Sequence, residues 1–209
     1  MKTIVCAQRT PAWYAARLGK LTGSAVADAF ATRKDKAEAA GRRNTRLRLA
    51  LERITGKPQD NGYESRAMQR GAELEAQAIA AYEAETGVFV EPVGFLEHDT
   101  LAAGCSPDGL TSEGGTEIKC PEISAHYDYV KGGLPREYFL QCVHGLWITE
   151  LAWWDFVSFH PDFPERLRLK RTRIWAKDVD LVAHGLNVSL FLGEVDKEVE
   201  AVKALESAA

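Results

Sequence analysis

The chain has 209 residues, of which 45% are hydrophobic and 27% charged, and its formal net charge is −4. This length suits one substantial domain, so we expect a single domain over residues 1–209. No apolar run is long enough to span a membrane, which excludes an integral membrane protein with helical spans. The N-terminal residues lack the apolar core of a signal peptide, so we expect a cytoplasmic protein without a membrane partner.

The four cysteines are scattered, and none forms a C-x-x-C pair. They show no zinc spacing with the five histidines, so we expect reduced thiols and assign the histidines no role. Charge is distributed unevenly: residues 33–53 hold eight Lys/Arg against three Asp/Glu, and residues 178–209 hold two Lys against seven Asp/Glu. The basic region suits contact with a phosphate backbone, although a solvated helix face would have the same composition.

The first segment after the N-terminal lead predicts a helix from Pro11 to Leu18, because Pro is favoured in a first turn. Thr22 and Ser24 are good N-cap residues for a second helix over residues 25–31. A helix start with a hydroxyl and a nearby Arg17 is a natural seat for a phosphate. Simple capping beside a surface arginine is the alternative interpretation.

Two helices are expected next. Residues 44–55 carry an apolar stripe of Leu47, Leu51 and Ile54 at helical spacing. Residues 65–86 are rich in strong helix formers and end before a glycine. On the second helix, Glu75 falls on a stripe that is otherwise apolar, which is costly unless a partner or a metal satisfies the carboxylate. The alternative is that Glu75 lies at the edge of the stripe and reaches solvent.

The second half of the chain alternates strand and helix patterns. We expect strands over residues 89–96, 101–110 and 116–120, a connection over 122–134, a helix over 135–149, a central strand over 152–160, an edge strand over 168–175 and a last helix over 179–205. This order predicts an α/β fold with a central mixed β-sheet flanked by helices.

The most informative stretch is GCSPDGLTSEGGTEIKC, from Gly104 to Cys120. It predicts two strands joined by a Gly-rich turn over residues 112–115. Because side chains alternate along a strand, Glu117 and Lys119 share a face, and Asp108 shares a face with Ser106 on the strand before. If the two strands pair, two carboxylates and an ammonium converge.

Such a group suits a hard divalent cation, because Mg²⁺ prefers oxygen ligands and needs one or two carboxylates when a phosphate supplies more oxygens. Asp108, Glu117 and the backbone carbonyl of Ile118 are the candidate ligands, and Glu75 is a further one. Lys119 would orient or deprotonate the attacking water, or neutralise charge on the phosphate. A surface Glu/Lys pair across a hairpin is the alternative for this short pattern.

The sequence resembles the PD-(D/E)xK nuclease superfamily and, within it, the phage lambda-type exonucleases of viral recombination. Five motifs carry this resemblance in the family's order: W-x₃-R-x-G-x-x-T-x-S from Trp13, R-G-x-x-x-E from Arg70, C-S-P-D-G-L from Cys105, E-x-K-C-P from Glu117, and Y-x-x-Q from Tyr138 followed by W-x-T. They span residues 13–149. The resemblance implies a restriction-endonuclease-like core.

The resemblance also assigns roles. Asp108 and Glu117 would be metal ligands and Lys119 the catalytic lysine. Glu75 and Gln141 would help to place a metal or the water. A terminal 5′-phosphate would be held by Arg17, Ser24 and Ser106. Met68 occupies about the place of an apolar wedge between strands, and Arg33 or Lys34 would contact DNA.

As a family member, the protein is expected to be a 5′→3′ exonuclease on double-stranded DNA that leaves 3′ overhangs for phage-type recombination by strand annealing. The resemblance implies two Mg²⁺ ions, with Mn²⁺ as a substitute, a homotrimeric ring around DNA, a single-strand annealing partner, and a phage or prophage origin. The alternatives are a related endonuclease, a single-strand nuclease, or a non-catalytic DNA-end-binding protein. An intact Asp108, Glu117 and Lys119 set disfavours the last of these.

Overall fold

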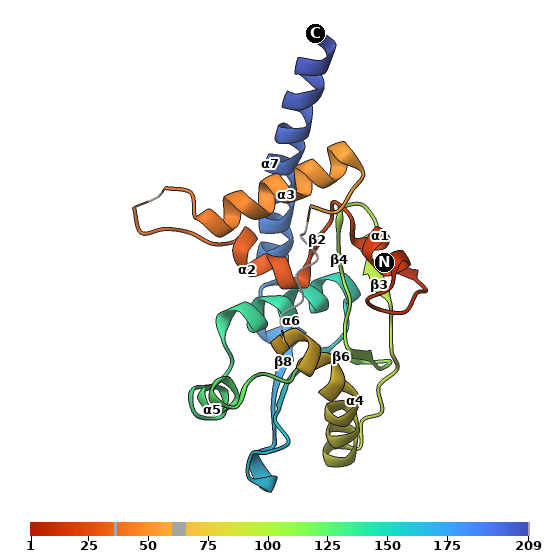
Figure 1. Ribbon diagram of the computed structural model, residues 1–209, viewed down its shortest axis with the longest axis vertical. Helices are drawn as coiled ribbons and strands as arrows, with labels where there is room; N and C mark the ends of the chain where they lie inside the picture. Colours follow the sequence, from red (N-terminus) through yellow and green to blue (C-terminus); the bar gives the residue numbers. More distant parts are fainter. Residues whose placement is uncertain (36, 60–65, 209) are drawn as a thin grey trace.

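The computed structural model describes residues 1–35, 37–59 and 66–208, with the backbone alone for residues 66–68. Its strands form two four-stranded sheets, and its helices cover them (Figure 1). The helices are α1 (Pro11–Arg17), α2 (Val26–Ala29), α3 (Ala40–Thr55), α4 (Arg66–Thr86), α5 (Ile123–Gly132), α6 (Arg136–Thr149) and α7 (Leu181–Ala208). Short 3₁₀ helices lie at Gly23–Ala25, Glu165–Leu167 and Ala176–Asp178. None of the described helices combines the length and the apolar character that a membrane span requires.

The first sheet has the order β1-β3-β4-β2, with β1 at Lys2–Ile4, β3 at Phe95–Glu97, β4 at Ala103–Cys105 and β2 at Leu21–Thr22. β3 pairs antiparallel with both β1 and β4, whereas β2 and β4 are parallel. This sheet is mixed, and it places the ends of β2 and β4 side by side. The residues that follow these two strands therefore lie close together.

The second sheet has the order β5-β6-β7-β8, with β5 at Gly109–Leu110, β6 at Gly114–Lys119, β7 at Trp153–Phe159 and β8 at Leu169–Trp175. β6 and β7 are parallel, and the other two pairings are antiparallel. All seven residues of β7 are buried, which confirms the central strand predicted from its apolar sequence. β8 forms an edge, also as predicted.

The mixed α/β fold class is confirmed, but the expected single sheet is divided in two. The predicted strand over residues 101–110 is broken between Cys105 and Gly109. Pro107 lies in this break, and a proline has no N–H to donate to a ladder. Two other expectations were wrong in detail. Residues 122–134 contain the helix α5 rather than a simple connection, and Gly114 and Gly115 belong to β6 rather than to the turn before it.

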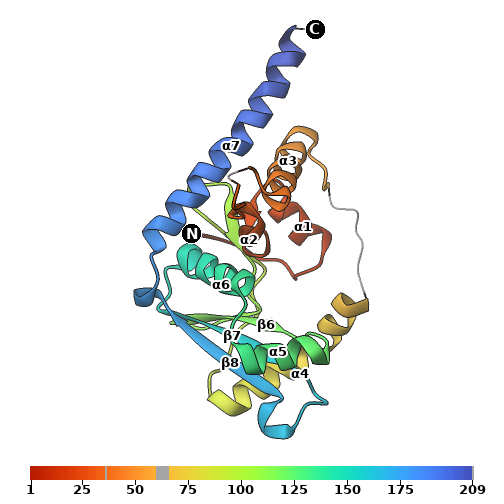
Figure 2. The ribbon, with the colours of Figure 1, turned by 90° about the vertical axis from the view of Figure 1, so that its left-hand side faces the viewer.

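Two apolar cores lie on the two faces of the second sheet. Helix α6 covers one face, where Trp154 and Phe156 are buried, and α4 covers the other, where Ile118 and Val157 are buried (Figure 2). Helix α6 comes unusually close to the sheet because Gly145 has no Cβ; a Cβ there would lie 2.5 Å from the Trp154 ring. This contact fixes the position of α6 against β7.

Helices α3 and α7 pack against each other through ion pairs. Arg42 contacts Glu194 at 2.7 Å, and Arg46 contacts Glu198 at 3.0 Å. The basic region and the acidic C-terminal region expected from the sequence therefore neutralise one another in part. The apolar stripe expected on α3 was wrong: Leu51 is exposed, and the buried positions are Thr45, Leu49, Ala50 and Glu52.

Candidate active site

Glu117 and Lys119 lie on the same face of β6, as their spacing of two predicts. The Lys119 ammonium is 2.5 Å from Oε1 of Glu117. Glu117 is buried, whereas the Lys119 side chain is 31% exposed. Ile118 between them packs into the core on the opposite face. The pair thus consists of a buried carboxylate and an ammonium that solvent or a ligand can reach.

Asp108 lies in the break between the two sheets and is held against β6. Its N–H donates to the carbonyl of Thr116 at 3.1 Å, and its Oδ2 accepts a hydrogen bond from the N–H of Ile118 at 2.6 Å. Gln8 supports the break, because its Nε2 donates to the carbonyl of Pro107 at 2.8 Å. The structure therefore brings Asp108 beside Glu117 and Lys119. Asp108 is held there by its own hydrogen bonds to β6, and not by a continuous strand that pairs with β6 along its whole length.

Burial and the neighbouring charges shift the pKa of Asp108. Burial raises the pKa of Asp108 well above its usual range, the charge of Glu117 raises it further, and Lys119 lowers it. Burial lowers the pKa of Lys119, but the charges of Glu117 and Asp108 outweigh it and the net shift is upward. Lys119 is therefore an ammonium at neutral pH. Of the roles expected for it, this favours neutralising charge and orienting water over removing a proton.

These residues fit a hard divalent cation. The described residues contain no group of three or more His, Cys, Asp and Glu side chains that is arranged to hold a metal. Mg²⁺ does not need one, because it keeps waters and takes further oxygens from a substrate phosphate. Two carboxylates face one ammonium, and the charge of Glu117 adds to burial in raising the pKa of Asp108. A divalent cation held by Asp108 and Glu117 would offset it.

Of the two helix-borne candidates, Glu75 lies at the margin of this group, and Gln141 lies toward Gly23. The Glu75 side chain on α4 is 29% exposed and pairs with Arg9 at 2.5 Å, so the edge position is the correct interpretation. Its charge still contributes to the raised pKa of Asp108. Gln141 on α6 lies against Gly23, where a Cβ would be 3.1 Å from its Cγ.

A second group of polar side chains gathers where β2 and β4 end. Nη1 of Arg17 donates to Oγ of Ser106 at 3.2 Å, and Nη2 donates to Oγ1 of Thr22 at 3.3 Å. Oγ of Ser24 is 3.5 Å from Oγ1 of Thr22. Trp13 donates its indole N–H to the same Ser106 oxygen at 2.8 Å. The structure thus assembles the three residues expected to hold a 5′-phosphate, and we call this group, with Thr22 and Trp13, the hydroxyl–arginine pocket.

The guanidinium of Arg17 has no carboxylate within ion-pair distance among the described residues. Burial, followed by the charge of Arg48 on α3, lowers the pKa of Arg17 to about 10. Arg48 pairs with the buried Glu52 at 3.1 Å, and Glu52 also accepts the N–H of Gly19 at 2.8 Å. Sequence reasoning missed Arg48, because only the fold brings α3 against the loop after α1.

The residues expected to contact DNA are less constrained. Arg33 and Lys34 are exposed, and Arg33 forms an ion pair with Asp35 at 2.7 Å. The expected wedge, Met68, lies on α4, but its side chain is outside the described part of the chain. These three assignments stay predictions.

Comparison with known proteins places these features in a family. Residues 12–152 match the model of the YqaJ-like viral recombinase domain. No curated protein matches the chain. Two crystal structures of an alkaline exonuclease from Laribacter hongkongensis, one of them in complex with dAMP, are 39% identical to it and cover 95% of this chain and 99% of theirs, with TM-scores of 0.84 and 0.85.

A phage-related exonuclease from Haemophilus somnus 129PT shares 16% identity over 90% of this chain and 96% of its own, with a TM-score of 0.65, which shows a common fold. The family match covers more than half of the chain and includes all five motifs. Together with the similarity to the Laribacter structures, it supports a nuclease function. The chain belongs to the YqaJ-like viral recombinase domain family.

Proposed function

We propose that this protein is a metal-dependent exonuclease that degrades one strand of double-stranded DNA in the 5′→3′ direction and leaves 3′ overhangs. The observation that carries the proposal is a direct covalent link between two sites. Ser106 in the hydroxyl–arginine pocket and Asp108 in the carboxylate group are separated by Pro107 alone. A relative that is 39% identical was crystallised with dAMP, a nucleoside monophosphate of the kind that such digestion would release.

The hydroxyl–arginine pocket would bind the terminal 5′-phosphate. Arg17 and the hydroxyls of Ser24 and Ser106 offer charge-assisted hydrogen bonds to phosphate oxygens. Arg48 adds positive charge next to Arg17. A site of this kind favours an end over an internal phosphodiester, since a terminal phosphate has three non-bridging oxygens and a higher negative charge, whereas an internal phosphate has two such oxygens.

The next phosphate along the strand would lie at the carboxylate group. Mg²⁺ or Mn²⁺, in one or two ions held by Asp108 and Glu117 with the Ile118 carbonyl, would supply an activated water and stabilise negative charge. Lys119, as an ammonium, neutralises charge on the phosphate and orients the water. Glu75, at the margin of the group, and Gln141 on α6 would help to position the water. Hydrolysis breaks the bond from phosphorus to the 3′ oxygen and leaves a new 5′-phosphate on the shortened strand, which is again a substrate.

Assembly and biological role are further parts of the proposal. The family's viral recombinase domain supports a role in phage-type recombination, in which a single-strand annealing protein would take over the 3′ overhang. We propose a homotrimeric ring around the duplex, in which Arg33 and Lys34 contact DNA and Met68 separates the strands. Mass measurement in solution, with and without DNA, tests the trimer.

The activity is tested by digesting a linear duplex in Mg²⁺ beside a closed circular duplex. The linear substrate carries either 5′-phosphate or 5′-hydroxyl ends, with label at one end or the other. We expect loss from the 5′ ends only, faster with phosphate, and no digestion by Lys119→Ala. Cutting of the circle would indicate an endonuclease, and earlier loss of 3′ ends would reverse the proposed direction. An inactive wild type that still binds duplex ends would indicate an end-binding protein.

A further inference from the structure

A cavity of about 400 Å³ opens beside the carboxylate group, between α5 and α6. This volume is within the range of pockets that hold small organic groups. Its lining includes Lys119, which connects it to the candidate active site, and the side chains of Tyr129, Leu134, Tyr138 and Phe156. None of the sequence motifs assigns this cavity a role, because residues 122–134 give no sign of the helix that forms one of its walls.

The floor of the cavity is aromatic. Tyr138 and Phe156 are stacked, with ring centroids 4.9 Å apart and an interplanar angle of 19°. Tyr129 packs on the same Phe156 ring, also at 4.9 Å. Phe156 and Tyr129 are buried and Tyr138 is half-buried, so Tyr138 is the ring that presents surface to the cavity. An accessible aromatic surface binds nucleobases of any sequence, because every base has a π-face. The rim adds two carboxylates, Asp128 and Glu137, which accept hydrogen bonds from base amino groups but repel phosphate.

Helix α6 places the cavity in line with the other two sites. Tyr138 faces the cavity, and the Lys119 ammonium is 5.5 Å from its ring centroid. Gln141, nearly one turn later, contacts Gly23 next to Ser24 of the hydroxyl–arginine pocket. Cavity, ammonium and phosphate-binding hydroxyls thus follow one another along the same helix.

We propose that this cavity binds the base of the second nucleotide, the one that becomes the new 5′ end after each cut. The inference rests on the proposed function. When the terminal phosphate is in the hydroxyl–arginine pocket and the next phosphate is beside Lys119, the strand continues toward the cavity. The chemistry of the cavity selects a nucleobase, since it is aromatic inside and acidic at the rim.

A base enclosed in this way is separated from its complement. The second base pair must therefore open before the first cut, and stacking on Tyr138 offsets part of that cost. Loss of base–aromatic stacking typically costs about 1–3 kcal/mol, so we expect roughly a tenfold slower first cut without it.

The experiment measures single-turnover release of the first nucleotide from 5′-phosphorylated duplexes. One duplex is intact, one has an abasic residue at position 2, and one has it at position 6. We expect the position-2 abasic duplex to be cut about tenfold more slowly than the other two. An abasic residue also loosens the duplex, so a faster or unchanged first cut would mean that opening alone matters, and it would overturn the proposal.

Variants of Tyr138 locate the contact. On the intact duplex, Tyr138→Leu should lose about as much rate as the abasic substrate, Tyr138→Phe should lose little, and Tyr127→Leu, on the exposed face of α5, should lose nothing. On the position-2 abasic duplex, Tyr138→Leu should cause no further loss. If the loss from Tyr138→Leu and the loss from the abasic residue are additive, the base does not bind at Tyr138 and the assignment is overturned. A wild type that releases no 5′ nucleotide from any duplex would overturn the proposed function itself, which separates the two failures.

Discussion

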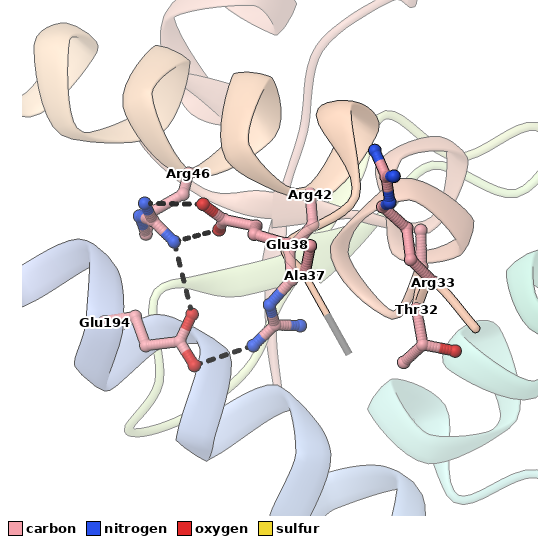
Figure 3. A pocket seen from close by; sticks show the side chains of 8 residues that line it. Thr32, Arg33, Ala37, Glu38, Arg42, Arg46 and Glu194 are labelled. Carbon is pink, nitrogen blue, oxygen red and sulfur yellow. Dashed lines mark hydrogen bonds and ion pairs between the residues drawn. The ribbon is translucent and has the colours of Figure 1, made fainter. Parts of the chain in front are cut away.

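Two regions of this molecule gather arginines and carboxylates, but their charges are arranged in opposite ways. The first is a cavity of about 510 Å³ between α3, α7 and the loop before α3, lined by Arg42, Arg46, Glu38 and Glu194 (Figure 3). There Arg46 pairs with Glu38, Glu194 and Glu198, and Arg42 pairs with Glu194. The second is the candidate active site, where Arg17 has no carboxylate partner among the described residues and two carboxylates share one lysine.

The difference separates a structural cluster from a ligand site. In the first region each arginine already has its counter-charge, so a ligand would have to displace an ion pair in order to bind. In the second, Arg17 lacks a carboxylate partner among the described residues, and Asp108 and Glu117 share one lysine; both arrangements are costly in a partly buried place. A phosphate and a divalent cation relieve both costs together. The cavity of about 510 Å³ is therefore a weaker candidate for a functional site than the group around Asp108 and Arg17.

The sharpest test of this comparison is Asp108→Asn. It removes a buried metal-ligand candidate whose ionised form is disfavoured by burial and by Glu117, so we expect activity to fall by at least about a hundredfold while the melting temperature stays equal or rises. Nuclease assays and thermal melts of the same preparation check both. A lower melting temperature would show that Asp108 is needed for folding instead.

The next largest effect is expected for Arg17→Ala. A charge-assisted hydrogen bond is worth about 1.5–3 kcal/mol, so the preference for 5′-phosphate over 5′-hydroxyl ends should shrink by roughly tenfold or more. Arg43→Ala, an exposed arginine of α3, is the matched control and should keep the preference. The ratio of the two rates is the measurement, because it cancels general losses of activity. An unchanged ratio in Arg17→Ala would remove the phosphate from this pocket.

In the ion-pair cluster around Arg46, we expect the opposite pattern: a loss of stability without a loss of activity. Arg46→Ala leaves Glu38, Glu194 and Glu198 without their shared partner, and the Arg46 side chain is only 17% exposed. We expect a loss of about 2 kcal/mol in the free energy of unfolding. Nuclease activity measured well below the melting temperature should stay within about twofold. Lys203→Ala, which breaks an exposed pair with Glu200, should change neither quantity. Strongly reduced activity in folded Arg46→Ala would give this cluster a direct role.

A third cluster, of two histidines, avoids charge altogether. His144 and His184 are buried and hydrogen-bonded at 3.1 Å. Burial lowers the pKa of His144 to about 3, with a further contribution from His184, and it lowers the pKa of His184 to about 4. The unfolded chain takes up protons near pH 6.5 and the folded chain does not, so stability is lost as pH falls from about 6.5 toward 4.

At pH 5 this loss amounts to about 2 kcal/mol per histidine. Denaturant unfolding at a series of pH values measures it. His184→Gln should flatten the dependence between pH 4.5 and 6.5 relative to the wild type. An equally steep dependence in the variant would assign the effect to other groups.

The sequence was most informative where a local rule decides the structure. Alternation along a strand predicted that Glu117 and Lys119 share a face, and helical periodicity together with the following glycine predicted α4 almost to the residue. The positions of Ser24 and Ser106 in one pocket came from resemblance to a family. No local rule brings two segments some eighty residues apart to the ends of two paired strands.

Tertiary contacts explain what could not be predicted. On α3, the apolar Leu51 is exposed and the charged Glu52 is buried, because Glu52 accepts the backbone N–H of Gly19 from another segment. The face of a helix that is buried is then set by its partner and not by its own pattern. Helix α5 was missed because its buried His126 is satisfied by Ser158 and Leu167, which lie far along the chain.

The break at Pro107 has a consequence for the length of the product. Ser106 follows the first sheet and Asp108 precedes the second, so the group that holds the end and the group that cuts belong to different sheets. In the proposed reaction, the spacing from Ser106 to Asp108 sets the distance from the bound 5′-phosphate to the phosphodiester that is cut, which is one nucleotide. Gln8 holds the residue between them by donating to the carbonyl of Pro107. In such a nuclease, the length of each released product is set by the fixed backbone between the phosphate-binding residues and the cutting residues.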